Sequence, residues 1–90
     1  MEISNLVFTD TLPSIDLHGY DRQSAIVAIN DFIEESLVMQ NEFVSIIHGI
    51  GSGVIREATI NALLKNKNVL DFKSDYNNRG CMIVKINIKS

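Results

Sequence analysis

Two segments of this sequence repeat apolar residues at the spacing of an amphipathic helix, and short apolar or alternating segments lie before, between and after them. The predicted order of elements is therefore strand, helix, strand, helix, strand, strand. A helix that joins two parallel strands makes a right-handed crossover. Two crossovers that step across the sheet in the same direction place both helices on one face. The sequence thus predicts an α/β (α+β) two-layer sandwich, with two helices on one face of a four-stranded mixed sheet and the other face open.

The first predicted helix opens at Asp21, whose carboxylate suits an N-cap, and runs from Arg22 to about Gln40. Asn41 is the expected stop, because asparagine tolerates the left-handed conformation that often ends a helix. The second helix is expected to begin at or after Gly53 and to end near Asn66. The residues expected to face the core are Ala25, Ile26, Ile29, Phe32, Ile33 and Leu37 in the first helix and Val54, Ile55, Ala58, Ala62 and Leu63 in the second, with Ile60 and Leu64 widening the second stripe.

Four segments have the composition of strands. The second of them is almost continuously apolar, as a strand covered on both faces would be, which indicates a central position in the sheet. A turn is expected at residues 77–80, ahead of the last strand. The four predicted strands are Ser14–His18, Phe43–His48, Val69–Asp75 and Cys81–Ile88.

One domain is expected, because a chain of 90 residues is too short to give each of two halves its own core. The domain is predicted to span residues 14–90. Residues 1–13 are left as an unassigned N-terminal extension. Leu6, Val7 and Phe8 could add an edge strand there, but Pro13 interrupts any continuation.

The composition excludes several classes of protein. One cysteine and two histidines are too few for an intrachain disulfide or a structural zinc site. No apolar run approaches the roughly 18 residues of a membrane span, and the first residues do not resemble a signal peptide, so a soluble, cytoplasmic protein without membrane contact is expected. The net charge of −3 does not suit a protein that binds nucleic acid through bulk positive charge. Any site for a polyanion must therefore be local.

Both histidines of the chain stand at the predicted end of a strand, and a glycine follows each of them. The two pairs are His18-Gly19 and His48-Gly49. Parallel strands bring their carboxyl ends to one rim, where ligands of open α/β sheets usually bind. Because adjacent strands lie roughly 4.8 Å apart, the two side chains could serve one ligand. A structural or surface role for each histidine is the alternative.

A glycine-rich segment, Gly49-Ile50-Gly51-Ser52-Gly53, connects the second strand to the second helix, and Arg56 follows in the first turn of that helix. Glycines let backbone N–H groups approach an anion, and the amino end of a helix adds a favourable dipole, so the segment predicts a phosphate cradle. A turn that only reverses the chain is the alternative. The spacing matches neither the dinucleotide-binding fingerprint nor a P-loop.

The arginines Arg22, Arg56 and Arg79 are all expected at this rim, which would give an acidic domain one cationic edge. The alternative is that they pair with nearby acids. Asp16 lies two residues before His18 and shares its sheet face, but one carboxylate and one imidazole are too few ligands to assign a metal site. A divalent cation could be held there only if substrate phosphates supplied further ligands.

Two segments resemble the signatures of the Smr (small MutS-related) domain family: Ile15-Asp16-Leu17-His18-Gly19 resembles Leu-Asp-Leu-His-Gly, and His48-Gly49-Ile50-Gly51-Ser52-Gly53-Val54-Ile55-Arg56 resembles His-Gly-x-Gly-x-Gly-x-Leu-Arg. The resemblance covers Ser14 to Ile88 and departs in the last turn, where family members often carry several glycines. It implies a fold similar to the carboxyl-terminal domain of bacterial translation initiation factor three. It also implies nucleic-acid binding, with endonuclease activity in some members, and a chain that is either a stand-alone domain or the carboxyl-terminal part of a larger protein.

Three functions are compatible with these residues. The first is an endonuclease for DNA or RNA, in which His18 and His48 exchange protons with the reacting oxygens. RNA would attack through its own 2′-hydroxyl without a metal, whereas DNA would need water activated by a divalent cation at Asp16. The second is a non-catalytic nucleic-acid-binding or interaction module, and the third is a site for a small phosphate-containing ligand such as a nucleotide. The residues assigned to phosphate binding are Gly19, Gly49, Gly51, Ser52, Gly53, Arg22, Arg56 and Arg79.

Overall fold

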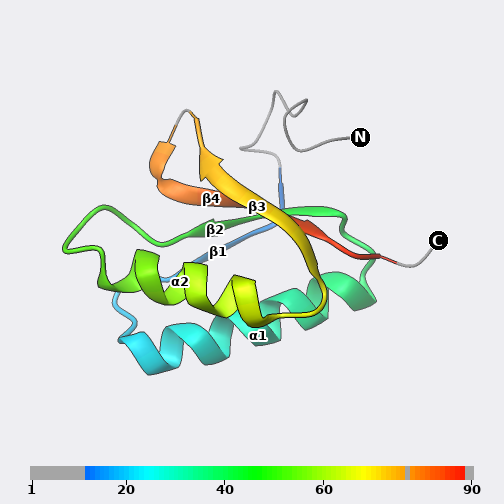
Figure 1. The fold of residues 1–90 in the computed structure, drawn as a ribbon, viewed down its shortest axis with the longest axis horizontal. Coiled ribbons are helices and arrows are strands. Elements are labelled where there is room, and N and C mark those ends of the chain that lie inside the picture. The colour runs from blue at the N-terminus through cyan, green and yellow to red at the C-terminus, as the bar shows by residue number, and fades with distance from the viewer. Residues whose placement is uncertain (1–11, 77, 89–90) are drawn as a thin grey trace.

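The computed structural model describes residues 12–76 and 78–88, so the suggested edge strand around Leu6 to Phe8 lies outside the described residues. Within them the chain forms four strands and two helices, and both helices cover the same face of the sheet (Figure 1). This arrangement confirms the predicted two-layer architecture. The elements are β1 (Ser14–Asp16), α1 (Arg22–Val38), β2 (Phe43–Ile47), α2 (Val54–Lys65), β3 (Val69–Asp75) and β4 (Asn78–Ile86).

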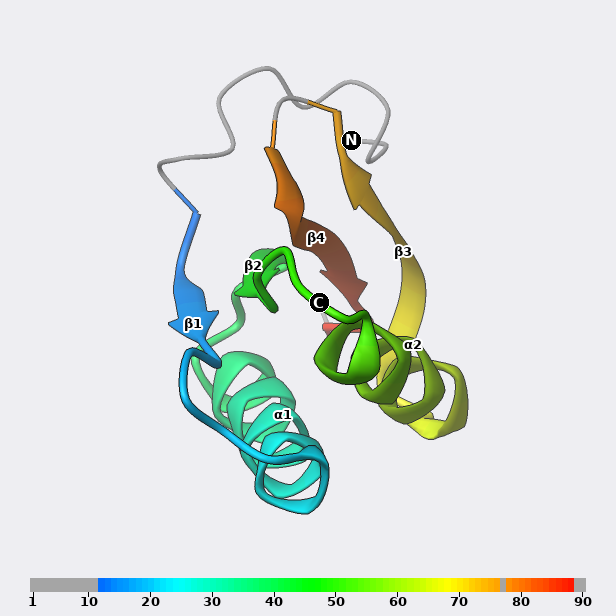
Figure 2. The same ribbon diagram turned by 90° about the vertical axis from the view of Figure 1, so that its left-hand side faces the viewer.

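The described strands form a mixed sheet in the order β1-β2-β4-β3 (Figure 2). β1 pairs in parallel with β2, whereas β4 is antiparallel to both of its neighbours, β2 and β3. β1, β2 and β3 therefore run in the same direction, and their carboxyl ends lie at the same end of the sheet. The last strand, β4, lies between β2 and β3 and runs antiparallel to both, so it starts where they end.

Helix α1 begins and ends with well-formed caps. Asp21 and Ser24 form a reciprocal capping box, in which the Asp21 carboxylate accepts the Ser24 backbone N–H at 2.8 Å. At the other end the left-handed residue is Gln40, with φ 61°, rather than the predicted Asn41. The Asn41 N–H reaches back to the Ser36 carbonyl at 2.9 Å, which is the 6→1 hydrogen bond of a Schellman motif. Helix α1 therefore ends at Val38, two residues before the predicted Gln40, and Asn41 follows the left-handed residue as the donor of that bond.

Helix α2 packs on the core through the positions spaced four residues apart, Ala58 and Ala62, together with Thr59 and Leu63. Val54 was expected on the same stripe but is 48% exposed, because it opens the helix at the edge of the sheet. Leu64, expected to widen the stripe, is 69% exposed because it lies one residue round the helix from buried Leu63.

The core lies between the helices and the inner strands, but the opposite face of the sheet is not open at its centre. Cys81 and Ile83 of β4 are only 5% and 2% exposed, which corrects the prediction of an uncovered second face. Ile83 pairs with Ser45 on one side and Lys73 on the other, so side chains from both neighbouring strands flank it. The buried core cluster consists of Leu17, Ala25, Ile29, Ile33, Val44, Ile46, Ala62, Leu63, Met82, Val84 and Ile86.

Strand β4 begins at Asn78, three residues before the predicted start, so most of the expected turn at residues 77–80 is strand. The Asn78 side chain accepts the Gly80 N–H at 3.0 Å, and the Gly80 carbonyl accepts two N–H groups, from His48 at 2.8 Å and from Gly49 at 3.0 Å. These hydrogen bonds extend the pairing of β4 beyond the end of β2. They also attach β4 to the glycine-rich segment.

Neither helix in the described part of the chain has the length and apolarity that a membrane span requires.

Candidate functional site

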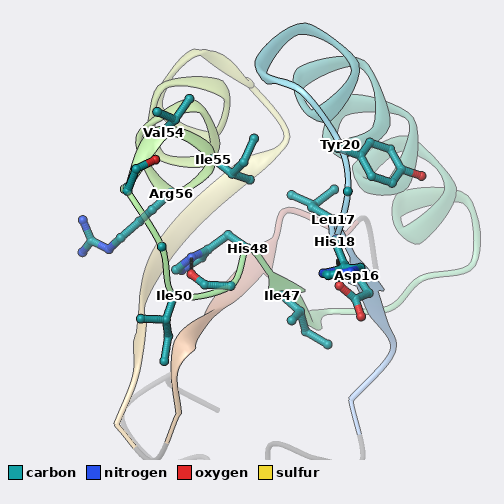
Figure 3. A pocket seen from close by; sticks show the side chains of 15 residues that line it. Asp16, Leu17, His18, Tyr20, Ile47, His48, Ile50, Val54, Ile55 and Arg56 are labelled. Atoms are coloured by element: carbon teal, nitrogen blue, oxygen red, sulfur yellow. Dashed lines mark hydrogen bonds between the residues drawn. The ribbon is translucent and has the colours of Figure 1, made fainter.

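A pocket of about 510 Å³ lies at the carboxyl ends of β1 and β2, and residues of both sequence signatures line it (Figure 3). One wall is the segment that follows β1, and the other is the glycine-rich segment with the first turn of α2. His18 and His48 therefore line one pocket, as their positions at neighbouring strand ends predict. The lining residues are Asp16, Leu17, His18, Gly19, Tyr20 and residues 47–56. We call this the rim pocket.

His18 and Asp16 lie together on one side of the rim pocket, and both are exposed. One Asp16 carboxylate oxygen, Oδ1, accepts the backbone N–H of His18 at 2.9 Å. Asp16 thereby fixes the direction in which the chain leaves β1. The imidazole of His18 is free to meet a ligand from solvent.

His48 is held on the opposite side of the rim pocket and is only 7% exposed. Its Nδ1 donates to the Gly49 carbonyl at 2.8 Å, because a carbonyl can only accept. Nε2 is buried and has no hydrogen-bond partner among the described residues. Burial lowers the pKa of His48 below its ordinary value of 6.5; the hydrogen bond to Gly49 opposes this shift, and the charge of Arg56 adds to it. Burial therefore favours the neutral form of the ring.

The loop of residues 49–53 requires glycine at both of its ends. Gly49 and Gly53 have φ of 82° and 91°, in the left-handed region that side chains disfavour. Gly53 is also the N-cap residue of α2 and provides no side-chain cap, so the first N–H groups of the helix are left for solvent or a ligand. Gly51 differs, because its φ is not in that region and no heavy atom lies within 4 Å of the position of an added Cβ.

Arg56 lines the rim pocket, and its side chain points away from His18 and Asp16 (Figure 3). Its guanidinium Nη2 donates to the Ser74 hydroxyl, on β3, at 3.4 Å. Arg56 therefore lies over the side of the loop that faces β3.

The three arginines do not share one pocket. Arg56 and Arg79 both line a second, smaller pocket on the far side of the glycine loop. Arg22 instead lines a separate depression with Gln23, Ile26 and Val27 of α1. The physical reason is that α1 and α2 begin over different strands, so their first turns diverge (Figure 2).

Ser74 and Asp75 also line the second pocket, although neither is among the site residues assigned from the sequence. A signal for them was present, because they end the third strand, which runs in the same direction as the two histidine-bearing strands. Among residues 12–76 and 78–88, no group of three or more histidine, cysteine or acidic side chains lies close enough to hold a metal ion.

Comparison with known proteins places these residues in a family. The protein-family model described as Smr domain matches residues 15–87 of this chain. The chain is 36% identical over 73 residues to the protein named endonuclease MutS2 of Streptococcus suis strain 05ZYH33, and 41% identical over 66 residues to that of Streptococcus uberis. These matches cover 78% and 73% of this chain but only 9% and 8% of the relatives, so the chain spans less than a tenth of their length.

Two solved structures share the fold. The crystal structure of the Smr domain of Thermus thermophilus MutS2 superposes with a TM-score of 0.80 at 24% identity, covering 83% of this chain and 98% of that one. YdaL, a stand-alone small MutS-related protein from Escherichia coli, superposes with a TM-score of 0.77 at 20% identity, covering 81% of this chain and 63% of YdaL. Since the family model spans the chain from β1 to just beyond the end of β4, the chain belongs to the Smr domain family.

Proposed function

We propose that this domain binds nucleic acid at the rim pocket, with a backbone phosphate held by the glycine loop. The observation that carries the proposal is the junction of two strand ends with the uncapped amino end of α2, which leaves N–H groups facing an open pocket. The names of the MutS2 relatives, which are endonucleases, support the same class of ligand. With a net charge of −3, binding depends on these local contacts and not on bulk charge.

We further propose that the site can cut a phosphodiester, with His18 as the residue that exchanges a proton with a reacting oxygen. An exposed imidazole suits this role because it can reach a ligand from solvent and can both accept and donate a proton. With RNA, the 2′-oxygen forms the new bond to phosphorus and gives up its proton, while the bond to the 5′-oxygen breaks and that oxygen takes up a proton. With DNA, water supplies the attacking oxygen.

The second histidine of the predicted acid–base pair is placed differently. Nδ1 of His48 is engaged by Gly49 and Nε2 is buried, so proton exchange with a ligand requires the ring to leave this position. In the observed geometry His48 holds the loop in shape. This observation favours the second candidate function, a module that binds nucleic acid without cutting it.

A cleavage assay separates the two candidates. Wild type, His18→Ala and His48→Ala are incubated with supercoiled DNA and with structured RNA, with and without chelator. Loss of cleavage in His18→Ala supports the nuclease. Equal cleavage by wild type and His18→Ala would identify a contaminant and refute cleavage by this site.

A binding assay tests the interface itself, and α1 offers a matched control. Arg56 and Arg22 are both exposed arginines in the first turn of a helix, but only Arg56 lines the rim pocket. Arg56→Ala should weaken nucleic-acid binding about tenfold, the effect of losing one hydrogen bond to a charged group, whereas Arg22→Ala should leave it unchanged. Equal effects of both variants would contradict the placement of the site.

A further inference from the structure

The second pocket adjoins the rim pocket and has a volume of about 340 Å³. The two pockets share the glycine loop as a common wall, since residues 49, 50, 51 and 53 line both. The remaining lining residues are Arg56, which is common to both, and Ser74, Asp75 and Arg79 from the β3–β4 end of the sheet. A chain-like ligand that lies across the loop would therefore enter both pockets.

The charge of the second pocket suits an anion. Arg56 is directed toward it by the hydrogen bond to the Ser74 hydroxyl, and Arg79 supplies a second guanidinium. Asp75 contributes one carboxylate, which is buried. Two cations and one anion leave an excess of positive charge in a domain whose overall charge is −3.

The two pockets are held in a fixed relation by the start of β4. The Gly80 carbonyl accepts the N–H groups of His48 and Gly49. A Cβ on Gly80 would come within 3.3 Å of the Gly49 Cα, so the two backbones are in close contact. Arg79 precedes this contact directly, and its position relative to the loop is set by it.

We propose that the second pocket binds a neighbouring phosphate of the same nucleic-acid strand whose first phosphate lies in the rim pocket. This inference rests on the proposed function and adds a direction to it: the strand crosses the glycine loop from the β1 side to the β3 side. Arg56 and Arg79 then act as anchoring residues that bind and position the strand, while His18 faces the reacting phosphate. The specificity that follows is for a strand with at least two phosphates, not for a mononucleotide.

The test compares wild type, Arg79→Ala and Lys73→Ala in their binding to fluorescent oligonucleotides of increasing length. Lys73 is the matched control, because it is an exposed cation on β3 that does not line the second pocket. A single-phosphate nucleotide should bind wild type and Arg79→Ala equally. From three nucleotides upward, Arg79→Ala should bind about tenfold more weakly, with a salt slope lower by about 0.7, the value for one phosphate contact on a single strand. Lys73→Ala should match wild type at every length.

The outcomes keep the two proposals apart. If wild type binds long oligonucleotides and Arg79→Ala binds them equally well, the second pocket is not a subsite and only this inference fails. If wild type binds no nucleic acid of any length, the proposed function fails with it. Where cleavage is measurable, Arg79→Ala should raise KM and leave kcat unchanged. A fall in kcat alone would assign Arg79 to the reaction and refute the anchoring role.

Discussion

Replacing Gly51 by alanine should separate the folding role of the glycine loop from its binding role. Nothing lies within 4 Å of the new Cβ, and the backbone at Gly51 is outside the left-handed region. The substitution therefore causes no strain and restricts the unfolded chain, so the free energy of unfolding should stay unchanged or rise by about 0.4–1 kcal/mol. The Cβ instead occupies space at the mouth of both pockets, where the proposed phosphate approaches the loop.

The expected loss of affinity follows from the contacts that the Cβ displaces. One hydrogen bond between a loop N–H and a phosphate is worth about 1.5–3 kcal/mol, so binding should weaken by about 10- to 150-fold. Gly49→Ala and Gly53→Ala, in contrast, should lower the free energy of unfolding. Their φ values of 82° and 91° impose a cost of about 1–2 kcal/mol on a residue with a Cβ.

Urea unfolding and fluorescence anisotropy on the same three variants measure both quantities. A stable Gly51→Ala variant that has lost affinity would show that this glycine serves the ligand. If Gly51→Ala lowered the free energy of unfolding by more than about 1 kcal/mol, the loop geometry would be wrong. If it bound nucleic acid as well as wild type, the loop would not be the phosphate site.

Three further predictions concern stability. Gly80→Ala should cost about 1–2 kcal/mol in urea unfolding, because its Cβ meets the Gly49 backbone at 3.3 Å; an unchanged midpoint would contradict this close contact. The lowered pKa of His48 stabilises the folded state; this contribution is complete above pH 6.5 and is lost as pH falls through the folded-state pKa. His48→Asn should therefore flatten the dependence of the free energy of unfolding on pH in this window. Identical pH slopes for wild type and variant would exclude the shift. Hydrogen bonds from Ser24 lower the pKa of Asp21 below 3.8, so the contribution of Asp21 to stability is present above that pH and is lost in stronger acid. Asp21→Asn should still cap the helix at neutral pH but should lack this acid-dependent loss of stability. Thermal melts of wild type and variant from pH 2 to 7 measure the difference.

Local properties of the chain determined a large part of this molecule. The order of the elements, the N-cap at Asp21 and the two His-Gly pairs at strand ends are all confirmed, since hydrophobic period and capping depend on neighbours in sequence. The resemblance carried by the two signatures is also confirmed, because the family model matches residues 15–87.

The position of β4 was decided only by tertiary structure. Strand order depends on pairing between residues far apart in sequence. The alternation of apolar and polar residues along a strand does not specify which strands it pairs with. Insertion of β4 between β2 and β3 buries Ile83 on the face that was expected to be open. It also brings Gly80 against Gly49, at the start of the glycine loop that lines both pockets.

The roles of the charged and titratable residues were likewise set by the assembled fold. Sequence placed His18 and His48 at equivalent strand ends, but only the packing of β4 and the loop around His48 made one ring buried and the other exposed. Arg22 and Arg56 occupy equivalent helix turns, yet they line different pockets because the two helices begin over different strands. Burial and proximity are properties of three-dimensional packing, whereas a sequence pattern specifies only which face of an element a residue occupies.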